Sequence, residues 1–225
     1  MGGFALRLRG VQLEVPLAAQ RVIAFLALQG RPVHRLVISG TLWIDSSEEH
    51  AGASLRTALW RLGQIAAGAV CSRGQTLALS ENVATDIAHA SSRASLLMER
   101  PEEHCERDLE LLGISGDLLP DWYDDWVLIE RERFRQLRLH ALESLCRALS
   151  AAGAHAQAVH AGLMAVAVEP LRESSHRALM SAYLAEGNPS EALRHGGLYK
   201  HQLAEALGID PSPRMEMLIA RIGRA

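Results

Sequence analysis

One short segment, SLRTALWRLGQ, combines hydroxyl, guanidinium and amide side chains within a helical pattern. Steps of about 100° per residue collect the apolar side chains on one arc, namely Ala51, Leu55, Ala58, Leu59, Leu62 and Ile65. The opposite arc and its flanks carry a different set: Ser54, Arg56, Thr57, Trp60, Arg61 and Gln64. Arginine can place two donors on guanine or on a phosphate, and serine and threonine hydroxyls make short, adaptable contacts. Such a face has the chemistry to bind nucleic acid.

We therefore expect Ser54, Thr57, Arg61 and Gln64 to face a DNA major groove. Arg56 is expected to lie beside a phosphate oxygen. A solvated helix face is the alternative interpretation of the same pattern. Trp60 argues against a purely solvated face, because an exposed indole is costly to leave without a partner. Half-burial of Trp60 against the hairpin or the next domain is an equal alternative.

Two further arginines are candidate contacts to the DNA backbone. Arg73 stands beside Gly74 in a short turn between two strand-like segments, where a cation can approach a phosphate. Arg35 opens a predicted helix, and the free N–H groups of a helix N-terminus also bind phosphates. Exposed arginines are common in hairpins, so these two residues gain meaning only from the elements around them.

Other chemistry-bearing residues favour structural roles. The run DWYDDW, residues 121–126, could supply paired acids for a metal or for acid–base work. It has no calcium-type loop, and we expect Trp122, Tyr123 and Trp126 to pack at the junction of two modules while the acids begin a helix. The histidines lack metal-site spacing, the three cysteines are isolated, and phosphate-loop and nucleophile-elbow motifs are absent. We predict no catalytic residue, no metal and no cofactor.

The elements around the polar segment follow a recognisable order. Two short strands are predicted within residues 4–15, a helix over 17–29 and a second over 34–42, with Leu36, Val37 and Leu42 facing inward. A longer helix is expected to begin at a capping box formed by Ser46 and Glu49 and to end at Gly68. A hairpin over 70–79 follows. This is the order of a winged helix, whose third helix enters the major groove.

The second half of the sequence is almost entirely helical in pattern. A helix over 87–100 is followed by a break at Pro101 and then by a long amphipathic helix. A repeat at a spacing of 34 follows, relating Leu145, Leu149, Gly153, Ala158, Val159 and Gly162 to Leu179, Tyr183, Gly187, Ala192, Leu193 and Gly196. This spacing is typical of tetratricopeptide (TPR) repeats. We predict a mainly α protein with a small β component, in which residues 1–95 form the winged helix and 96–225 an all-α, TPR-like domain.

Charge divides the chain in the same way. The formal net charge of −3 conceals +3 over residues 1–96 and −6 over the remainder. No apolar run approaches the ~20 residues that cross a bilayer. Together with the unpaired cysteines, this predicts a cytoplasmic protein without membrane contact.

Several stretches together resemble the actinobacterial antibiotic regulatory protein (SARP) family: RVIAFLALQGRPVHRLVISGTLW, ASLRTALWRL, LLPDWYDDWVLIERERFRQLRLHALE, VEPLRESSHRALMSAYLAEGNPSEALR and LGIDPS. The resemblance spans residues 13–218. It implies a winged helix joined to a bacterial transcriptional activator domain, and a pathway-type activator of transcription.

The same resemblance implies binding to direct repeats near a promoter, often by two protomers side by side, and contact with RNA polymerase. It places Ser54, Arg56, Thr57 and Arg61 on the recognition helix and Arg73 on the wing. The chain departs from the family pattern in its short N-terminal sheet and in the hairpin strand, where Gln75-Thr76-Leu77 replaces an aromatic. It also lacks the nucleotide-binding extension of larger members, so we expect no control by ATP.

Two functions from different classes follow. The first is a sequence-specific DNA-binding activator. The second is a helical-repeat adaptor whose winged helix binds protein, which the modest charge of +3 permits. Exposure of the 54–64 surface distinguishes the two.

Overall fold

The computed structural model describes residues 2–105, 107–113 and 116–223. Its contacts divide the chain into two compact units, Met1–Ala90 with Ser115–Glu132, and Ser91–Ile114 with Arg133–Ala225. The sequence placed a single boundary after residue 95. In the structure the chain leaves the first unit near that point and returns to it once, because Trp122 and Trp126 of the 116–132 segment pack against Phe4 and Phe25 there.

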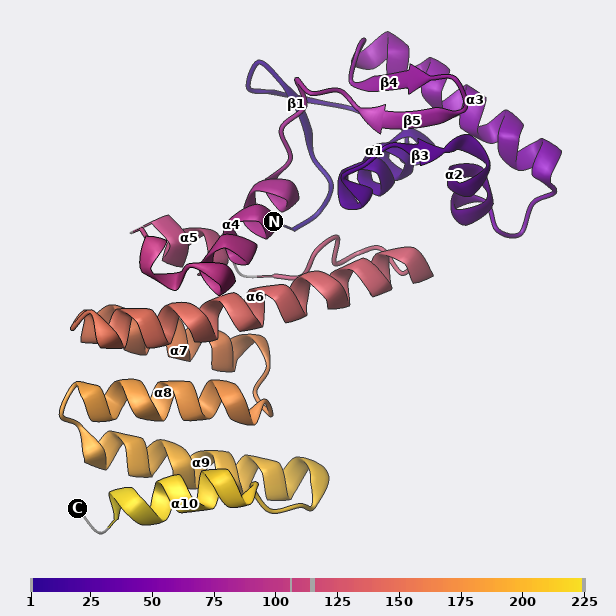
Figure 1. Ribbon diagram of the computed structural model, residues 1–225. Helices are drawn as coiled ribbons and strands as arrows, with labels where there is room; N and C mark the ends of the chain where they lie inside the picture. The colour runs from indigo at the N-terminus through magenta and orange to yellow at the C-terminus, as the bar shows by residue number, and fades with distance from the viewer. Residues whose placement is uncertain (1, 106, 114–115, 224–225) are drawn as a thin grey trace. The chain divides into compact units, whose positions relative to one another are not determined.

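The first unit begins with an antiparallel hairpin (Figure 1). Strand β1 (Leu6–Leu8) turns at Arg9 and Gly10, both with positive φ, into β2 (Val11–Leu13). Helix α1 (Leu17–Gln29) follows and ends at Gly30, whose φ of 60° closes the helix with a bond from its N–H to the Leu26 carbonyl. These elements match the predicted strands and helix.

A helix-turn-helix and a three-stranded sheet complete this unit. Strand β3 (Val33–His34) leads into α2 (Arg35–Leu42) and α3 (Glu48–Ile65), and β4 (Val70–Arg73) and β5 (Thr76–Leu79) form the hairpin. The sheet order is β3-β5-β4, with all pairs antiparallel. Strand β3 was not predicted, because two residues carry no periodicity.

The predicted inner face of α2 is wrong for two of its three residues. The buried residues of α2 are Ile38, Ser39 and Leu42, whereas Leu36 and Val37 are 55% and 53% exposed. Apolar residues in an eight-residue helix fit more than one register, and the packing of α2 against α1 and α3 selects the one with Ile38 inside.

The 116–132 segment packs on the first unit through its aromatics. Trp122 stacks on Phe4 with ring centroids 6.3 Å apart, and Trp126 meets the edge of Phe25 at 5.4 Å. Asp124 pairs with Arg21. Tyr123 was expected to pack with these tryptophans and is instead 78% exposed.

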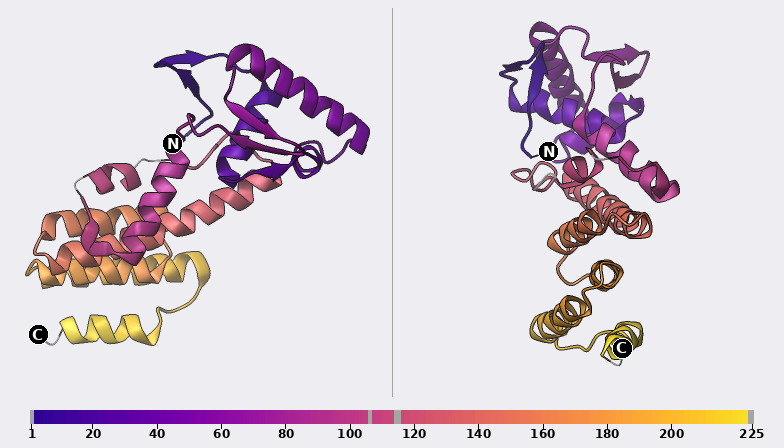
Figure 2. Two further views of the ribbon diagram at one scale, coloured as in Figure 1. Left: turned by 45° about the horizontal axis from the view of Figure 1, so that its top comes forward. Right: turned by 90° about the vertical axis from the view of Figure 1, so that its left-hand side faces the viewer.

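The second unit is helical. It contains most of α4 (Asp86–Glu99), the 3-10 turn Pro101–Glu103 and α5 (Arg107–Gly113). Most of α6 (Asp125–Ala151) follows, and then α7 (His155–Val168), α8 (Glu173–Ala185), α9 (Pro189–Leu207) and α10 (Pro213–Ile222). Helix α8 packs on both α7 and α9, and α10 packs on α9, which gives the layered stack of Figures 1 and 2. Helix α5 was not predicted.

The 34-residue repeat corresponds to a structural repeat. Gly153 and Gly187 both turn the chain between helices with positive φ, 78° and 88°. Gly162 and Gly196 are both buried where a neighbouring helix approaches closely. A Cβ on Gly162 would lie 3.0 Å from the Leu179 backbone, and one on Gly196 3.0 Å from Ile219 and Met180.

The fold class is thus confirmed as mainly α with a small β component, a winged helix followed by a helical domain. Among the described residues, no helix is both long and apolar enough to cross a membrane.

Candidate nucleic-acid interface

Helix α3 is built by a cap, two acids and an apolar stripe. Ser47 is the N-cap, and its hydroxyl accepts the backbone N–H of His50 at 3.4 Å. Glu48 and Glu49 occupy the first turn, where their carboxylates stabilise the helix by interacting with the positive end of its dipole. Ala51, Leu55, Ala58 and Leu62 are buried.

Both predicted ends of α3 differ from the observed ones. The predicted cap, Ser46, lies in a turn closed by its own N–H and the Trp43 carbonyl, so the cap is one residue later. The predicted end at Gly68 is also late, because the helix stops at Ile65 with Ala66 as its C-cap.

The outer face of α3 is open. Arg56, Thr57, Arg61 and Gln64 are exposed, Ser54 is partly exposed, and Trp60 is 66% exposed. The Thr57 hydroxyl donates to the Ala53 carbonyl at 3.0 Å, which leaves its oxygen as an acceptor. Figures 1 and 2 show α3 along the outside of the first unit.

Arg35 is held by the hairpin. Its backbone N–H donates to the Gln75 carbonyl at 2.8 Å, and its guanidinium donates to the Ser72 hydroxyl at 2.9 Å. These bonds depend on β3, the strand that places the start of α2 beside the hairpin. The side chain is half-buried, and the remaining guanidinium N–H groups can still meet an anion.

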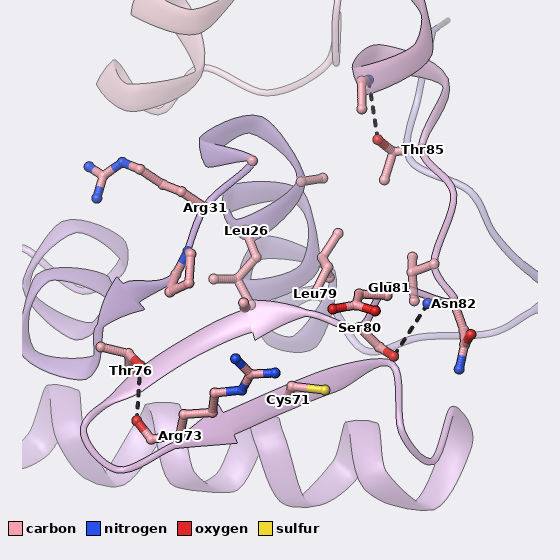
Figure 3. Close-up of a pocket in the computed structure, with 16 residues that line it drawn as sticks. Leu26, Arg31, Cys71, Arg73, Thr76, Leu79, Ser80, Glu81, Asn82 and Thr85 are labelled. Carbon is pink, nitrogen blue, oxygen red and sulfur yellow. Dashed lines mark hydrogen bonds between the residues drawn. The ribbon is translucent and has the colours of Figure 1, made fainter.

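Arg73 ends β4 on the exposed wing. Its carbonyl accepts the Thr76 hydroxyl at 2.9 Å, and Gly74 turns the chain with a φ of 58°. Figure 3 shows its side chain on the same side of the hairpin as Cys71, in an open hollow of about 570 Å³. Arg31, which follows the cap residue of α1, also borders this hollow.

The structure thus brings the predicted residues onto three elements of one unit, namely α3, the start of α2 and the hairpin strand β4. Ser54, Arg56, Thr57, Arg61 and Gln64 share α3, whereas Arg35 and Arg73 lie at the hairpin. Sequence reasoning did not see the Arg35–Ser72 contact, which joins residues 37 positions apart.

Sequence reasoning also missed a buried histidine pair in the second unit. His176 is fully buried; its Nδ1 lies 2.9 Å from Nε2 of His195, and its Nε2 lies 2.8 Å from the Pro170 carbonyl oxygen. Its ring packs on Tyr199 with centroids 4.2 Å apart. Burial lowers the pKa of both rings; that of His195, where the neighbouring His176 adds to the effect, falls to about 4, so burial favours the neutral form of each ring. Within the described ranges no group of three or more His, Cys, Asp or Glu could hold a metal ion.

A winged helix with an exposed third helix, followed by packed helical pairs, defines the class of this protein. The profile of the bacterial transcriptional activator domain family matches residues 83–223. The chain belongs to this family.

Similar proteins agree with this placement. The chain is 28% identical over 211 residues to regulatory protein AfsR of Streptomyces griseus, covering 90% of this chain and 22% of that protein. AfsR of Streptomyces coelicolor is 28% identical over 215 residues, with 90% and 21% covered. The chain therefore spans about a fifth of the length of these relatives. The resemblance to the antibiotic regulatory protein family is confirmed.

A solved structure shares the fold. EmbR of Mycobacterium tuberculosis, in complex with a low-affinity phosphopeptide, superposes with a TM-score of 0.74 at 22% identity. The match covers 99% of this chain and 63% of that one.

Proposed function

We propose that this protein is a sequence-specific DNA-binding regulator of transcription whose helix α3 enters the major groove. The observation that carries the proposal is the exposed outer face of α3, with its arginines and hydroxyl group, in a helix-turn-helix unit. In this arrangement Arg61, Thr57, Ser54 and Gln64 meet base edges, and Arg56 meets a phosphate. The sequence preference comes from the base contacts and the salt-sensitive affinity from the phosphate contacts.

The wing supplies the second contact. Arg73 lies on the exposed hairpin and Arg35 is tied to it, so both cations can reach the sugar–phosphate backbone that borders the groove. Phosphate contacts fix the orientation of the protein on the duplex and carry no sequence information directly.

In this proposal the helical unit is the part of the protein that acts on transcription once α3 has bound DNA. Family membership and the regulatory relatives support a role in the activation of transcription. We propose that the protein activates a biosynthetic pathway through contact with RNA polymerase, with two protomers side by side on a direct repeat near the promoter. The protein acts in the cytoplasm, where bacterial DNA lies. No catalytic step and no cofactor form part of this proposal.

A protein-binding adaptor is the second candidate. Exposed apolar side chains favour it, since Leu36 and Val37 on α2 and Ile44 after it are 55%, 53% and 78% exposed. Exposed apolar patches commonly mark protein interfaces.

Selection from a library of random duplexes, with the full chain as bait, separates the two. Enrichment of a direct repeat supports the DNA-binding regulator. A protein that enriches no sequence, and binds no duplex at ~50 mM salt where phosphate contacts are strongest, is the adaptor.

A further inference from the structure

Trp60 occupies the middle of the open face of α3. Steps of about 100° per residue place it within about 60° of Arg56, Thr57 and Gln64. Its side chain is 66% exposed, and it forms no ring pair with any aromatic of the described residues. Internal packing therefore gives no reason for an indole here, and water is a poor partner for so large an apolar surface.

Two small residues also lie on the face of α3 that carries Trp60. Ala53 and Gly63 share its face of the helix, and a Cβ added to Gly63 would meet nothing within 4 Å. Glycine in a helix interior costs about 1 kcal/mol relative to alanine. Because a Cβ at position 63 would meet no other atom, close packing inside the protein does not explain why a glycine stands there. Ala53 and Gly63 therefore add no bulk on this face beside an indole that is 66% exposed.

The charges around this surface select the partner. Arg56 and Arg61 flank Trp60 and are exposed, and the face carries a threonine hydroxyl and a glutamine amide. Arg56 and Arg61 can pair with negative charges on either side of Trp60, so this surface suits a polyanion that presents an apolar group between its charges. The major groove of duplex DNA has this character: its phosphates border the groove, and thymine alone presents a methyl group at its floor.

We propose that Trp60 is a specificity-determining residue that recognises thymine by packing its indole against the 5-methyl group. The proposal rests on the DNA binding of α3 proposed above. Hydrogen bonds from the neighbouring side chains choose among donor and acceptor patterns, whereas the indole distinguishes a methyl group from its absence.

The test compares two chemical changes that each remove one partner. The wild-type chain first selects its preferred duplex from a random library, and the Trp60→Ala variant repeats the selection. The selected duplex is then made with deoxyuridine in place of each thymine in turn, which removes only the methyl group. Affinities are measured by fluorescence anisotropy. Tyr123→Ala is the control, because it removes another exposed aromatic of the same unit that does not lie on α3.

We expect one or two thymines at which deoxyuridine weakens wild-type binding about fourfold, the value of about 0.8 kcal/mol for one buried methyl-sized group. The Trp60→Ala variant should lose that sensitivity and the thymine preference at the same positions, while Tyr123→Ala keeps both. Such a coupling between one side chain and one methyl group is what a double-mutant cycle isolates.

Two results overturn the inference while leaving DNA binding intact. In one, Trp60→Ala selects the same sequence with unchanged deoxyuridine sensitivity. In the other, it weakens all duplexes equally. Failure of the wild-type chain to select any duplex instead removes the proposed function itself. Circular dichroism of both variants verifies that the folded state persists.

Discussion

The guanidinium of Arg35 donates to the hydroxyl of Ser72 at 2.9 Å, and this bond joins the first residue of α2 to the hairpin strand β4. Arg35 thereby has two separable roles, as a cation near the proposed DNA backbone and as a tie for the wing. The two roles can be tested with different substitutions.

Replacing Arg35 by alanine removes the charge and the tie, whereas Ser72→Ala removes only the tie. We expect Arg35→Ala to weaken duplex binding and to lower the slope of log affinity against log salt by about 1. Ser72→Ala should keep the slope and change the free energy of unfolding by less than about 1 kcal/mol, since the bond is exposed. Anisotropy titrations at several salt concentrations check both; equal slopes for the two variants would show that Arg35 meets no phosphate.

Arg61 and Arg73 are expected to make different kinds of contact with DNA, the first with a base and the second with a phosphate. Arg61→Ala should weaken binding to the selected duplex by about 1–3 kcal/mol and relax the preference at one base position, because a base contact is lost. Arg73→Ala should weaken all duplexes alike, because a phosphate contact carries no sequence information. Competition between selected and scrambled duplexes measures the difference. Unchanged affinity of a folded Arg61→Ala protein removes that residue from the interface.

Two adjacent glycines of α9, Gly196 and Gly197, should respond in opposite ways when each is replaced by alanine. Gly196→Ala places a methyl group 3.0 Å from Ile219 and Met180, so we expect about 1–3 kcal/mol of destabilisation from overpacking. Gly197→Ala meets nothing within 4 Å and should stabilise the helix by about 0.5–1 kcal/mol. Chemical denaturation followed by circular dichroism compares the pair. The close packing of this repeat is contradicted if both substitutions act alike.

Glu143 makes the stability of the helical unit depend on pH. Burial alone would raise the pKa of this carboxyl group, but hydrogen bonds from Ser174, Arg172 and Ser175 outweigh burial and lower the pKa below its ordinary 4.5. A lowered pKa in the folded state stabilises the protein above pH 4.5, and that stabilisation is lost as the pH falls through the lowered value.

Glu143→Gln should therefore cost about 1–3 kcal/mol at pH 7 and flatten the loss of stability between pH 5 and lower values. Thermal unfolding at a series of pH values measures this. Glu205, exposed on α9 and paired at the surface with His201, provides a control position, where the same change should alter stability by less than about 0.5 kcal/mol. Parallel pH profiles for wild type and Glu143→Gln would contradict the assigned role.

Much of the molecule followed from the sequence because local patterns recur every few residues. The spacing of Ala51, Leu55, Ala58 and Leu62 determined the buried side of α3 and hence its open side. The glycines at 153 and 187, and at 162 and 196, marked the turns and close contacts of a 34-residue repeat. These features depend on neighbours along the chain, and a periodic pattern is enough to predict them.

Tertiary structure decided what depends on residues far apart in the chain. The tie between Arg35 and Ser72, the return of Trp122 and Trp126 to Phe4 and Phe25, and the pairing of His176 with His195 have no periodic signal. Strand β3 and the cap at Ser47 also depend on a neighbouring element or on a shift of one residue. Long-range contacts arise from the complementarity of surfaces after the helices and strands have formed, so the folded chain alone could establish them.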